Sequence, residues 1–321
     1  MQVKILYDKI FTFKYFKKFF FSKEIIFMIK VAGTLIINAF LNSPQTNQTY
    51  EWIVESAKRH NIDLDLKTNA DFLTSVDSKS LLKAPEKSDF ILFWNKDIML
   101  GKALENQGYR LFNPSRGIYL CDNKAFTVNA LAGKINMPKT ISIPMTFDTI
   151  GYNQFDFIDD IEAILGFPFV IKECYGSYGG QVYLATNKEE AIGILKKVGA
   201  GDCIAQEYIS TSFGRDIRAY VVGDKVVAAM ERRNDHDFRA NITNGGSANP
   251  YKLTKEQEEM AIKAAKALEL DFAGVDLLFL ENDEPILCEV NSNAQFIGLY
   301  EATGINIPDY IFEHILKVLC K

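Results

Sequence analysis

The chain has 321 residues, 48% of them hydrophobic and 24% charged, with a formal net charge of -5. This length is too great for one small core and predicts two or three packed globular units. The acidic balance excludes a general nucleic-acid binder, which needs a basic surface to displace counterions from phosphates. Five scattered cysteines without a CxxC pair indicate reduced thiols of a cytoplasmic protein rather than a disulfide framework or a zinc site.

Residues 1–27 differ in composition from the rest of the chain. They hold six lysines against Asp8 and Glu24, a local charge of +4, and seven of the 24 phenylalanines. Because lysines interrupt the apolar run, it is neither a membrane span nor a clean signal sequence. We interpret the segment as a non-native or disordered extension, with Met28 as the native start and no membrane partner. The alternative is a basic, aromatic segment that lies on a membrane surface, and mass spectrometry of the native N-terminus distinguishes the two.

Residues 28–112 alternate apolar strands with helices. Strands are expected at 31–37, 89–94 and 109–112, and helices near 48–60 and 97–107. Because strands that alternate with helices imply a parallel sheet, we predict an α/β unit here. The turn signal Asn113-Pro114-Ser115 marks its end.

A second unit is expected over residues 113–208. Its predicted elements are a helix that contains Lys124 and ends at Asn136-Met137-Pro138, strands at 169–174, 181–185 and 203–208, and a helix at 188–198. The loop Gly176-Ser177-Tyr178-Gly179-Gly180 joins the first two strands. Its glycines would let backbone N–H groups approach phosphate oxygens. The alternative is an ordinary hairpin turn, since no Walker A lysine follows.

Residues 209–321 predict a third unit of antiparallel strands and helices. Strands at 217–222 and 225–230 are joined by the two-residue turn Gly223-Asp224. Further on, the sequence predicts a capped helix from Thr254 to Leu270, strands at 273–280 and 285–290, and a helix at 308–319.

The last strand pair carries two carboxylates that we expect to face each other. With Asn282-Asp283 as the turn, Asp276 lies opposite Glu289, and Asn291 shares the face of Glu289. Opposed carboxylates repel and need a counter-charge. Oxygen ligands with room for water and phosphate suit Mg²⁺. The alternative is neutralisation by a lysine or an arginine.

Several cations occur where an anionic ligand would explain them. Lys172 is centred in an apolar strand, where an ammonium group needs an anionic partner unless it reaches the sheet edge. Lys124 supplies a second cation, or belongs to a solvated helix surface. The arginines between Glu231 and Asn241 suit negative charge that develops on a phosphate or an oxyanion.

Arg218 has two readings. On its hairpin it is expected to share a face with Asp216 and Glu231, so a cross-strand ion pair is the alternative to a catalytic role. The three histidines form no visible relay, which favours a mechanism without a histidine base.

The stretch from about Asn113 to Cys320 resembles the RimK-type branch of the ATP-grasp superfamily, the alpha-L-glutamate ligases. The motifs that carry the resemblance are Asp122-Asn123-Lys124, Gly166 to Lys172, Gly176 to Gly180, Gln206 to Ile209, Asp216-Ile217-Arg218, Asp237 to Asn241, Ala273 to Asp276 and Glu289-Val290-Asn291. The resemblance implies an ATP-grasp fold of class α/β (α+β). Residues 28–112 would form a Rossmann-like pre-ATP-grasp domain, 113–208 the central and lid subdomain, and 209–321 the C-terminal subdomain with the metal site.

The resemblance also implies roles for individual residues. The residues expected to bind ATP are Lys124, Lys172, Ser177, Gly179, Gly180, Glu207, Tyr208, Ile209, Asp216, Arg239 and Asn241. The expected catalytic residues are Lys172, Arg218 and Arg239, and the expected metal ligands are Asp276, Glu289 and Asn291. The metal would be Mg²⁺, with two ions, and Mn²⁺ could replace it. One departure is Asn293-Ala294-Gln295 where the family commonly has Ser-Pro-Gly, which leaves the acceptor side open.

These expectations describe an ATP-dependent ligase that joins a carboxylate to an amine through an acyl phosphate. The partners would be ATP, a carboxylate and an amino acid such as glutamate, with a small molecule or a protein as acceptor, and the family is compatible with a homo-oligomer. The alternatives are an ATP-grasp ligase of the lysine-biosynthesis or dipeptide type, and a nucleotide-binding regulator without turnover.

Overall fold

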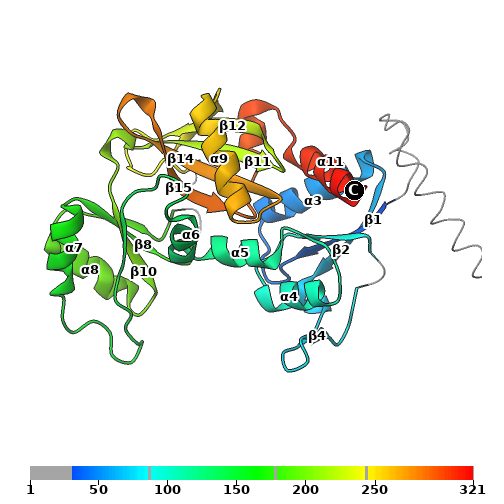
Figure 1. Cartoon of the computed structure of the whole chain (residues 1–321), viewed down its shortest axis with the longest axis horizontal. Coiled ribbons are helices and arrows are strands. Elements are labelled where there is room, and N and C mark those ends of the chain that lie inside the picture. The colour runs from blue at the N-terminus through cyan, green and yellow to red at the C-terminus, as the bar shows by residue number, and fades with distance from the viewer. Residues whose placement is uncertain (1–30, 86–87, 177–178, 243–244, 321) are drawn as a thin grey trace, which may run out of the picture.

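The computed structural model describes residues 31–85, 88–176, 179–242 and 245–320. Figure 1 shows three sheets arranged along the long axis of the molecule, with the predicted first unit at one end. Residues 1–27, interpreted above as an extension, lie outside the described residues. In the described part of the chain, no helix combines the length and the apolar character that a bilayer crossing requires.

The first sheet is parallel and has the order β2-β1-β5-β6, which confirms the parallel arrangement predicted from the strand–helix pattern. Its strands are β1 (Val31–Ile37), β2 (Ile62–Thr68), β5 (Phe90–Phe93) and β6 (Leu111–Phe112). Its helices are α3 (Pro44–Arg59) and α4 (Ile98–Asn106), and a small hairpin of β3 (Thr74–Ser75) and β4 (Ser80–Leu81) follows a 3-10 turn, η1 (Asn69–Asp71). Strand β2 was not predicted. It lies at the edge of the sheet, and polar residues alternate with apolar ones along it, so it lacks a continuous apolar run.

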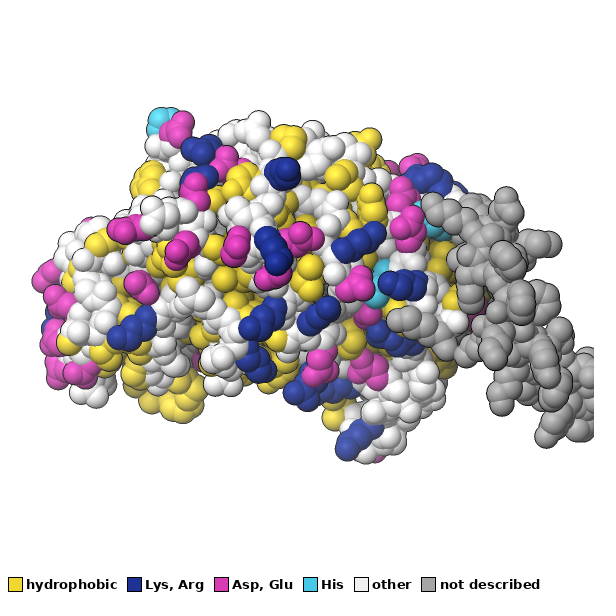
Figure 2. All heavy atoms as spheres, turned by 45° about the horizontal axis from the view of Figure 1, so that its top comes forward, with side chains coloured by type: hydrophobic (Ala, Val, Ile, Leu, Met, Phe, Trp, Pro, Cys, Tyr) yellow, Lys and Arg dark blue, Asp and Glu magenta, His cyan; other side chains and the backbone are white. Residues whose placement is uncertain are grey.

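The second sheet has the order β7-β10-β8-β9 and is antiparallel. Its strands are β7 (Thr140–Ser142), β8 (Phe169–Glu173), β9 (Val182–Ala185) and β10 (Cys203–Glu207). Helices α7 (Phe157–Leu165) and α8 (Lys188–Val198) cover one face, where Ile158, Ile161, Ala191 and Leu195 meet Phe169 and Ile171 in one core. Figure 2 shows acidic and basic side chains intermixed over most of the visible face, with acidic ones gathered at the end that carries α7 and α8.

The third sheet has the order β13-β12-β11-β14-β15 and is antiparallel. Its strands are β11 (Arg215–Val222), β12 (Lys225–Arg233), β13 (Ser247–Pro250), β14 (Phe272–Phe279) and β15 (Pro285–Asn291). One face packs on α9 (Lys255–Ala267), which begins at the predicted capping box of Thr254 and Gln257. The other face packs on α11 (Ile307–Leu319) and α3, so this sheet and the first one share a core that includes Leu35, Tyr220 and Phe312.

Two helices, α5 (Ser115–Asp122) and α6 (Lys124–Leu131), replace the single helix expected around Lys124. The break comes from Asn123, whose side chain caps α6 by accepting a hydrogen bond from the Phe126 N–H. The helix also ends at Leu131, six residues before the expected stop. Helix α10 (Ile297–Thr303) and the strand β7 were not predicted.

Candidate active site

A cavity of about 450 Å³ is lined by residues of the second and third sheets and, from the first unit, by residues of α3 and of the segment after β5. Most of the residues singled out from the sequence line it: Lys124, Lys172, Gly179, Glu207, Tyr208, Ile209, Asp216, Arg218, Arg239, Asn241, Asp276, Glu289 and Asn291. Gly180 is exposed and does not line it, and Ser177 lies outside the described residues. Residues that are more than 160 positions apart in the sequence therefore share one chamber.

The two carboxylates Asp276 and Glu289 are paired across β14 and β15, which confirms the predicted register. The connection between the two strands differs from the expected two-residue turn. Near the turn, Leu277 pairs with Leu287, one position out of step with the predicted pairing, because a 3-10 turn (η4, Glu281–Asp283) replaces the tight turn. A bulge at Cys288 then adds one residue to β15 and restores the predicted pairing beyond it.

Asp276 is held by two arginines. Arg218 donates from Nε and Nη2 to the two carboxylate oxygens, both at 2.6 Å, and Arg232 Nη2 lies 3.1 Å from Oδ2. Burial alone would raise the pKa of Asp276, but the two guanidinium groups outweigh burial and lower the pKa to about 2. The carboxylate is therefore ionised throughout the physiological range, so the counter-charge expected for it is present as arginine.

Arg232 connects this carboxylate to a second one. It donates to both oxygens of Asp216, at 2.7 and 2.6 Å. Burial raises the pKa of Asp216 although the Arg232 guanidinium opposes the shift. Four alternating charges, Arg218, Asp276, Arg232 and Asp216, thus form one continuous network on β11, β12 and β14, and we call it the cavity network.

Arg218 does form a cross-strand ion pair, as the alternative expected, but with Asp276 on β14 and not with Glu231. A bulge between Tyr220 and Val221 shifts the hairpin by one residue, so Arg218 pairs with Met230 and Glu231 pairs with Ile217. A shift of one residue moves a side chain to the opposite face of a sheet. Glu231 therefore faces away from Arg218, whose partner is Asp276.

Lys172 is the least compensated charge in the cavity. Its side chain is buried in β8, and with the described residues it makes no ion pair; its Nζ lies 3.9 Å from the Cys288 sulfur. Burial of an ammonium group without an anionic partner is unfavourable. Burial also raises the pKa of Cys288 to about 11, so this neighbour is a neutral thiol that does not balance the charge.

Lys124 and the glycine loop border the same end of the cavity. The Lys124 Nζ lies 3.8 Å from Glu289 Oε1 and donates to the Gly176 carbonyl at 3.4 Å. Lys124 is thus enclosed rather than part of a solvated helix surface. The loop joins the antiparallel strands β8 and β9, and Gly176 has a φ of 147°, a conformation that favours glycine.

Arg239 ties the arginine segment to this loop. Its guanidinium donates to the Gly179 carbonyl at 2.8 Å and to the Asp237 carboxylate at 2.7 Å. The hydrogen bonds that Arg239 donates to the Asp237 carboxylate raise the pKa of Arg239, and the side chain stays cationic. The loop and Arg239 are therefore positioned as one unit over the cavity.

The donors of the cavity fit a hard divalent cation. Asp276, Glu289 and Asn291 supply oxygen atoms from one strand pair, and the buried Nδ2 of Asn291 has no partner among the described residues. No group of three or more histidine, cysteine, aspartate or glutamate side chains clusters in the parts of the chain that are described. A cation here would therefore complete its shell with the amide oxygen and with ligand or water oxygens.

Sequence reasoning missed several lining residues. Arg232 lay within the arginine segment, but the bulged hairpin hid which face it occupies. Gln45 and Gln48 on α3, and Asn293 and Gln295 after β15, also line the cavity, where the first unit and the segment after β15 border it. No local signal marks these four amides, because α3 and β15 meet only in the folded chain.

Comparison with known proteins shows which family the sequence matches. The family described as the RimK-like ATP-grasp domain matches residues 121–315. The chain is 36% identical over 219 residues to a probable alpha-L-glutamate ligase of Legionella pneumophila, covering 67% of this chain and 70% of the relative. It is 30% identical over 258 residues to human N-acetylaspartylglutamate synthase A, covering 80% of this chain and 64% of the relative.

The fold also matches a solved structure. The ATP-grasp ligase PsnB, complexed with a phosphomimetic variant of a minimal precursor, Mg and ADP, superposes with a TM-score of 0.67 over 91% of this chain and 100% of that chain. The sequence identity is 14%, so this likeness concerns the fold alone.

Proposed function

The chain belongs to the RimK-like ATP-grasp family of ATP-dependent ligases, and we propose that it joins a carboxylate to the amine of an amino acid such as L-glutamate through an acyl phosphate. The acceptor would be a small molecule or a protein. One observation carries the proposal: Lys172, a buried ammonium group for which the described residues provide no ion-pair partner, shares one cavity with the opposed carboxylates Asp276 and Glu289. The phosphates of a nucleotide would supply the negative charge that Lys172 lacks, and the two carboxylates offer oxygen ligands to the metal that accompanies the nucleotide.

We assign the phosphates to the end of the cavity that Lys124, Lys172 and Arg239 line. These three cations would offset negative charge on the transferring phosphoryl group. Gly179 and Gly180, with Ser177 of the same loop, would cover the phosphates, and Asn241 would bind near the terminal one. Because Arg239 holds the Gly179 carbonyl, movement of this loop and of the arginine would be coupled.

We assign the adenosine to the part of the cavity lined by Glu207, Tyr208 and Ile209, at the end of β10. Asp216 would hold the ribose. Its oxygens already accept from Arg232, but a carboxylate has further lone pairs for a sugar hydroxyl.

Mg²⁺, with Mn²⁺ as a substitute, would be held by Asp276, Glu289 and Asn291 and would help to offset phosphate charge; we propose two ions. In the reaction, an oxygen of the substrate carboxylate bonds to the γ-phosphorus and ADP leaves. The amine then bonds to the acyl carbon and loses a proton, and phosphate leaves from the tetrahedral centre. Arg218 would stabilise the oxyanion of that centre, and the glycine loop would exclude water, which would otherwise hydrolyse the acyl phosphate.

The names of the relatives support glutamate as the amine and leave the acceptor open. All five cysteines are free, in keeping with reduced thiols, and we place the reaction in the cytoplasm.

The test is a screen of carboxylate and amine pairs with MgATP, read by phosphate release and by product mass. We expect phosphate release that requires both substrates and a product whose mass equals their sum minus one water. Nucleotide binding without amine-dependent phosphate release across a broad panel would contradict the proposal and favour a regulator.

A further inference from the structure

Arg218 occupies the oxygens that a metal ion would need. It binds both oxygens of Asp276 in a bidentate contact, with each distance at 2.6 Å. Bidentate guanidinium–carboxylate pairs are among the stronger polar contacts in proteins. Any cation that binds Asp276 directly must therefore compete with Arg218 for at least one oxygen.

If Arg218 moves away, the Asp276 carboxylate still has a positively charged partner. Arg232 contacts Asp276 at 3.1 Å and is itself anchored to Asp216 by two bonds. Both arginines line the cavity, but the Arg218 side chain is 13% exposed and the Arg232 side chain 5%. Arg232 is also held by two carboxylates, whereas the ion pair of Arg218 is with Asp276, so Arg218 is the one of the two that can leave more readily.

The Arg218 side chain runs past Gly274, whose lack of a Cβ lets Ala294 pack closely there. A Cβ at Gly274 would lie 2.4 Å from the Ala294 Cβ and 3.4 Å from the Arg218 Cδ. The arginine stem therefore passes beside Gly274, next to the segment 292–295 that follows Asn291. From this position the guanidinium borders both the metal carboxylate and the amide-lined end of the cavity.

We propose that Arg218 is a movable cation: a divalent ion displaces it from Asp276, and its guanidinium then turns to the carboxylate of the acceptor substrate at the 292–295 end of the cavity. This inference rests on the proposed ligase function. A divalent ion carries twice the charge of a guanidinium, so it can win the competition for Asp276 once Glu289 and Asn291 also bind it. The displaced arginine gains an anionic partner only when the substrate carboxylate is present. Metal and carboxylate should therefore bind cooperatively.

The experiment measures Mn²⁺ binding to the full-length protein without nucleotide, by the loss of the free Mn²⁺ signal in electron paramagnetic resonance. Arg218→Met removes the competitor and nearly preserves side-chain length. We expect the variant to bind Mn²⁺ about tenfold more tightly than the wild type, since a charge-assisted pair no longer opposes the ion.

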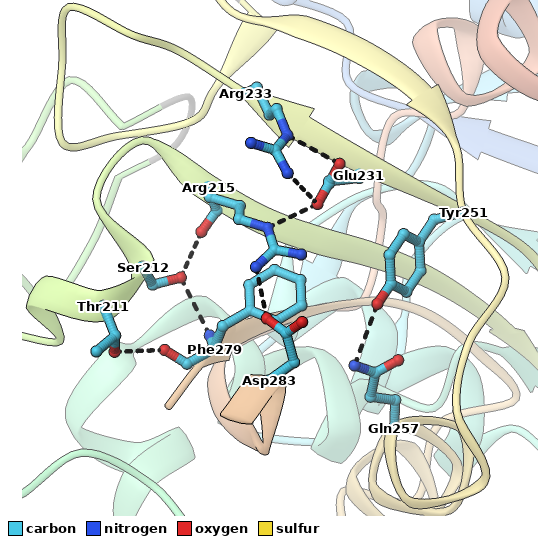
Figure 3. A network of polar contacts seen from close by, with 9 residues as sticks. All are labelled: Thr211, Ser212, Arg215, Glu231, Arg233, Tyr251, Gln257, Phe279 and Asp283. Carbon is cyan, nitrogen blue, oxygen red and sulfur yellow. Dashed lines mark hydrogen bonds and ion pairs between the residues drawn. The ribbon is translucent and has the colours of Figure 1, made fainter. Parts of the chain in front are cut away.

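Arg215→Met is the matched control. Arg215 lies on the same strand and borders the same cavity, but its carboxylate partners, Glu231 at 2.7 Å and Asp283 at 2.6 Å, do not belong to the proposed metal site (Figure 3). Arg215→Met loses the same unit of charge as Arg218→Met, so its Mn²⁺ affinity reports the general effect of removing one positive charge. We expect this affinity to stay within about twofold of the wild type, because Arg215 occupies no oxygen of a proposed metal ligand and its charge is already balanced by its own partners.

A double variant identifies the carboxylate. With Asp276→Asn in the background, Arg218→Met should no longer raise Mn²⁺ affinity, since the shared ligand is gone. Equal affinities of the wild type and Arg218→Met, or a gain that persists with Asp276→Asn, would overturn the proposal. If Arg218→Met does not fold, as judged by circular dichroism, Arg218→Lys replaces it, and an unchanged Mn²⁺ affinity in that variant counts against the proposal.

The outcome is separable from that of the ligase proposal. Substrate-dependent phosphate release in the wild type without a change in Mn²⁺ affinity would leave the ligase intact and remove only the movable cation. The expected change in Mn²⁺ affinity, in a protein that shows no substrate-dependent phosphate release, would support metal competition at Asp276 and contradict the ligase proposal.

Discussion

Two arginine–carboxylate networks lie on the same sheet and differ in what surrounds them. The cavity network joins Arg218, Asp276, Arg232 and Asp216, and the Arg232 and Asp276 side chains are each only 5% exposed. The second network, drawn in Figure 3, joins Arg215, Glu231, Arg233 and Asp283 near α9. We call it the outer network; its Arg233 and Asp283 side chains are 52% and 60% exposed.

The difference shows that ion pairing alone does not identify a functional site. Both networks use bonds between 2.6 and 3.1 Å and sit on the neighbouring strands β11 and β12. Solvent screens the outer network, so its pairs contribute little to stability. The cavity network has little screening and faces a chamber, so its charges act on whatever binds there. Five predictions test this contrast, beginning with the largest effect.

Glu289→Gln and Asp283→Asn compare two acidic residues of the β14–β15 hairpin region. The first should lower turnover by about a thousandfold, since it removes a proposed ligand of the metal that offsets phosphate charge. Its folding stability should change little, because Glu289 makes only a 3.8 Å contact with Lys124. The measurements are steady-state phosphate release and thermal melting.

Asp283→Asn is the control for that experiment. Asp283 has a positive φ of 61°, a conformation that asparagine tolerates well. Its turnover should match the wild type. Near-normal turnover of Glu289→Gln would refute the metal assignment.

Arg232→Met and Arg233→Met compare neighbours in sequence that point to opposite faces. Loss of Arg232 leaves two buried carboxylates short of a partner and should lower the free energy of unfolding by about 3 kcal/mol. Loss of the exposed Arg233 should lower it by about 0.5 kcal/mol. Denaturant unfolding of both variants gives the values, and equal losses would erase the distinction between the networks.

Lys172→Met should separate activity from stability. Turnover should fall by about a hundredfold, as expected when one preorganised charge is lost from phosphoryl transfer. The midpoint of thermal unfolding should hold or rise, because a buried ammonium without an ion-pair partner is replaced by an apolar chain of similar length. A large loss of stability would show that Lys172 has a structural partner and is not waiting for a phosphate.

Arg218→Met tests the catalytic role of the cavity network. If Arg218 stabilises the tetrahedral centre, kcat should fall by about tenfold to a hundredfold, with the KM for ATP little changed. Arg215→Met should leave both constants near the wild-type values. A rise in the KM for ATP alone would place Arg218 at the nucleotide instead.

Glu231→Gln should produce the smallest effect, and one that depends on pH. Burial would raise the pKa of Glu231, but Arg233 and Arg215 outweigh it and lower the pKa below the ordinary value of 4.5. A lowered pKa in the folded state stabilises the protein above about pH 4.5, and this contribution disappears as the pH falls below that value. At pH 7 we expect Glu231→Gln to be less stable than the wild type by about 1 kcal/mol or less.

The difference between the two proteins should shrink when urea unfolding is repeated at pH 3. If the difference in free energy of unfolding between the wild type and Glu231→Gln is the same at both pH values, the carboxylate charge is not the cause of that difference.

The local pattern of the sequence predicted elements whose signals are contained in one segment. The strand β1, the helix α8 and the capped helix α9 begin within one residue of the expected positions, because apolar periodicity and capping residues act over a few residues. The edge strand β2 and the short strand β7 escaped, since both owe their strand conformation to pairing with partners distant in sequence.

The ATP-grasp family and the facing of Asp276 and Glu289 were within reach of the sequence by itself, because motifs in order and a strand pair close to its turn are local information. The tertiary structure decided which charges neutralise that pair. Two β-bulges, at Val227 and at Cys288, set which side chains share a face, and their positions depend on packing between strands rather than on the residues of one strand. For the same reason the partnership of Arg218 with Asp276, 58 residues apart, could be found only in the folded chain.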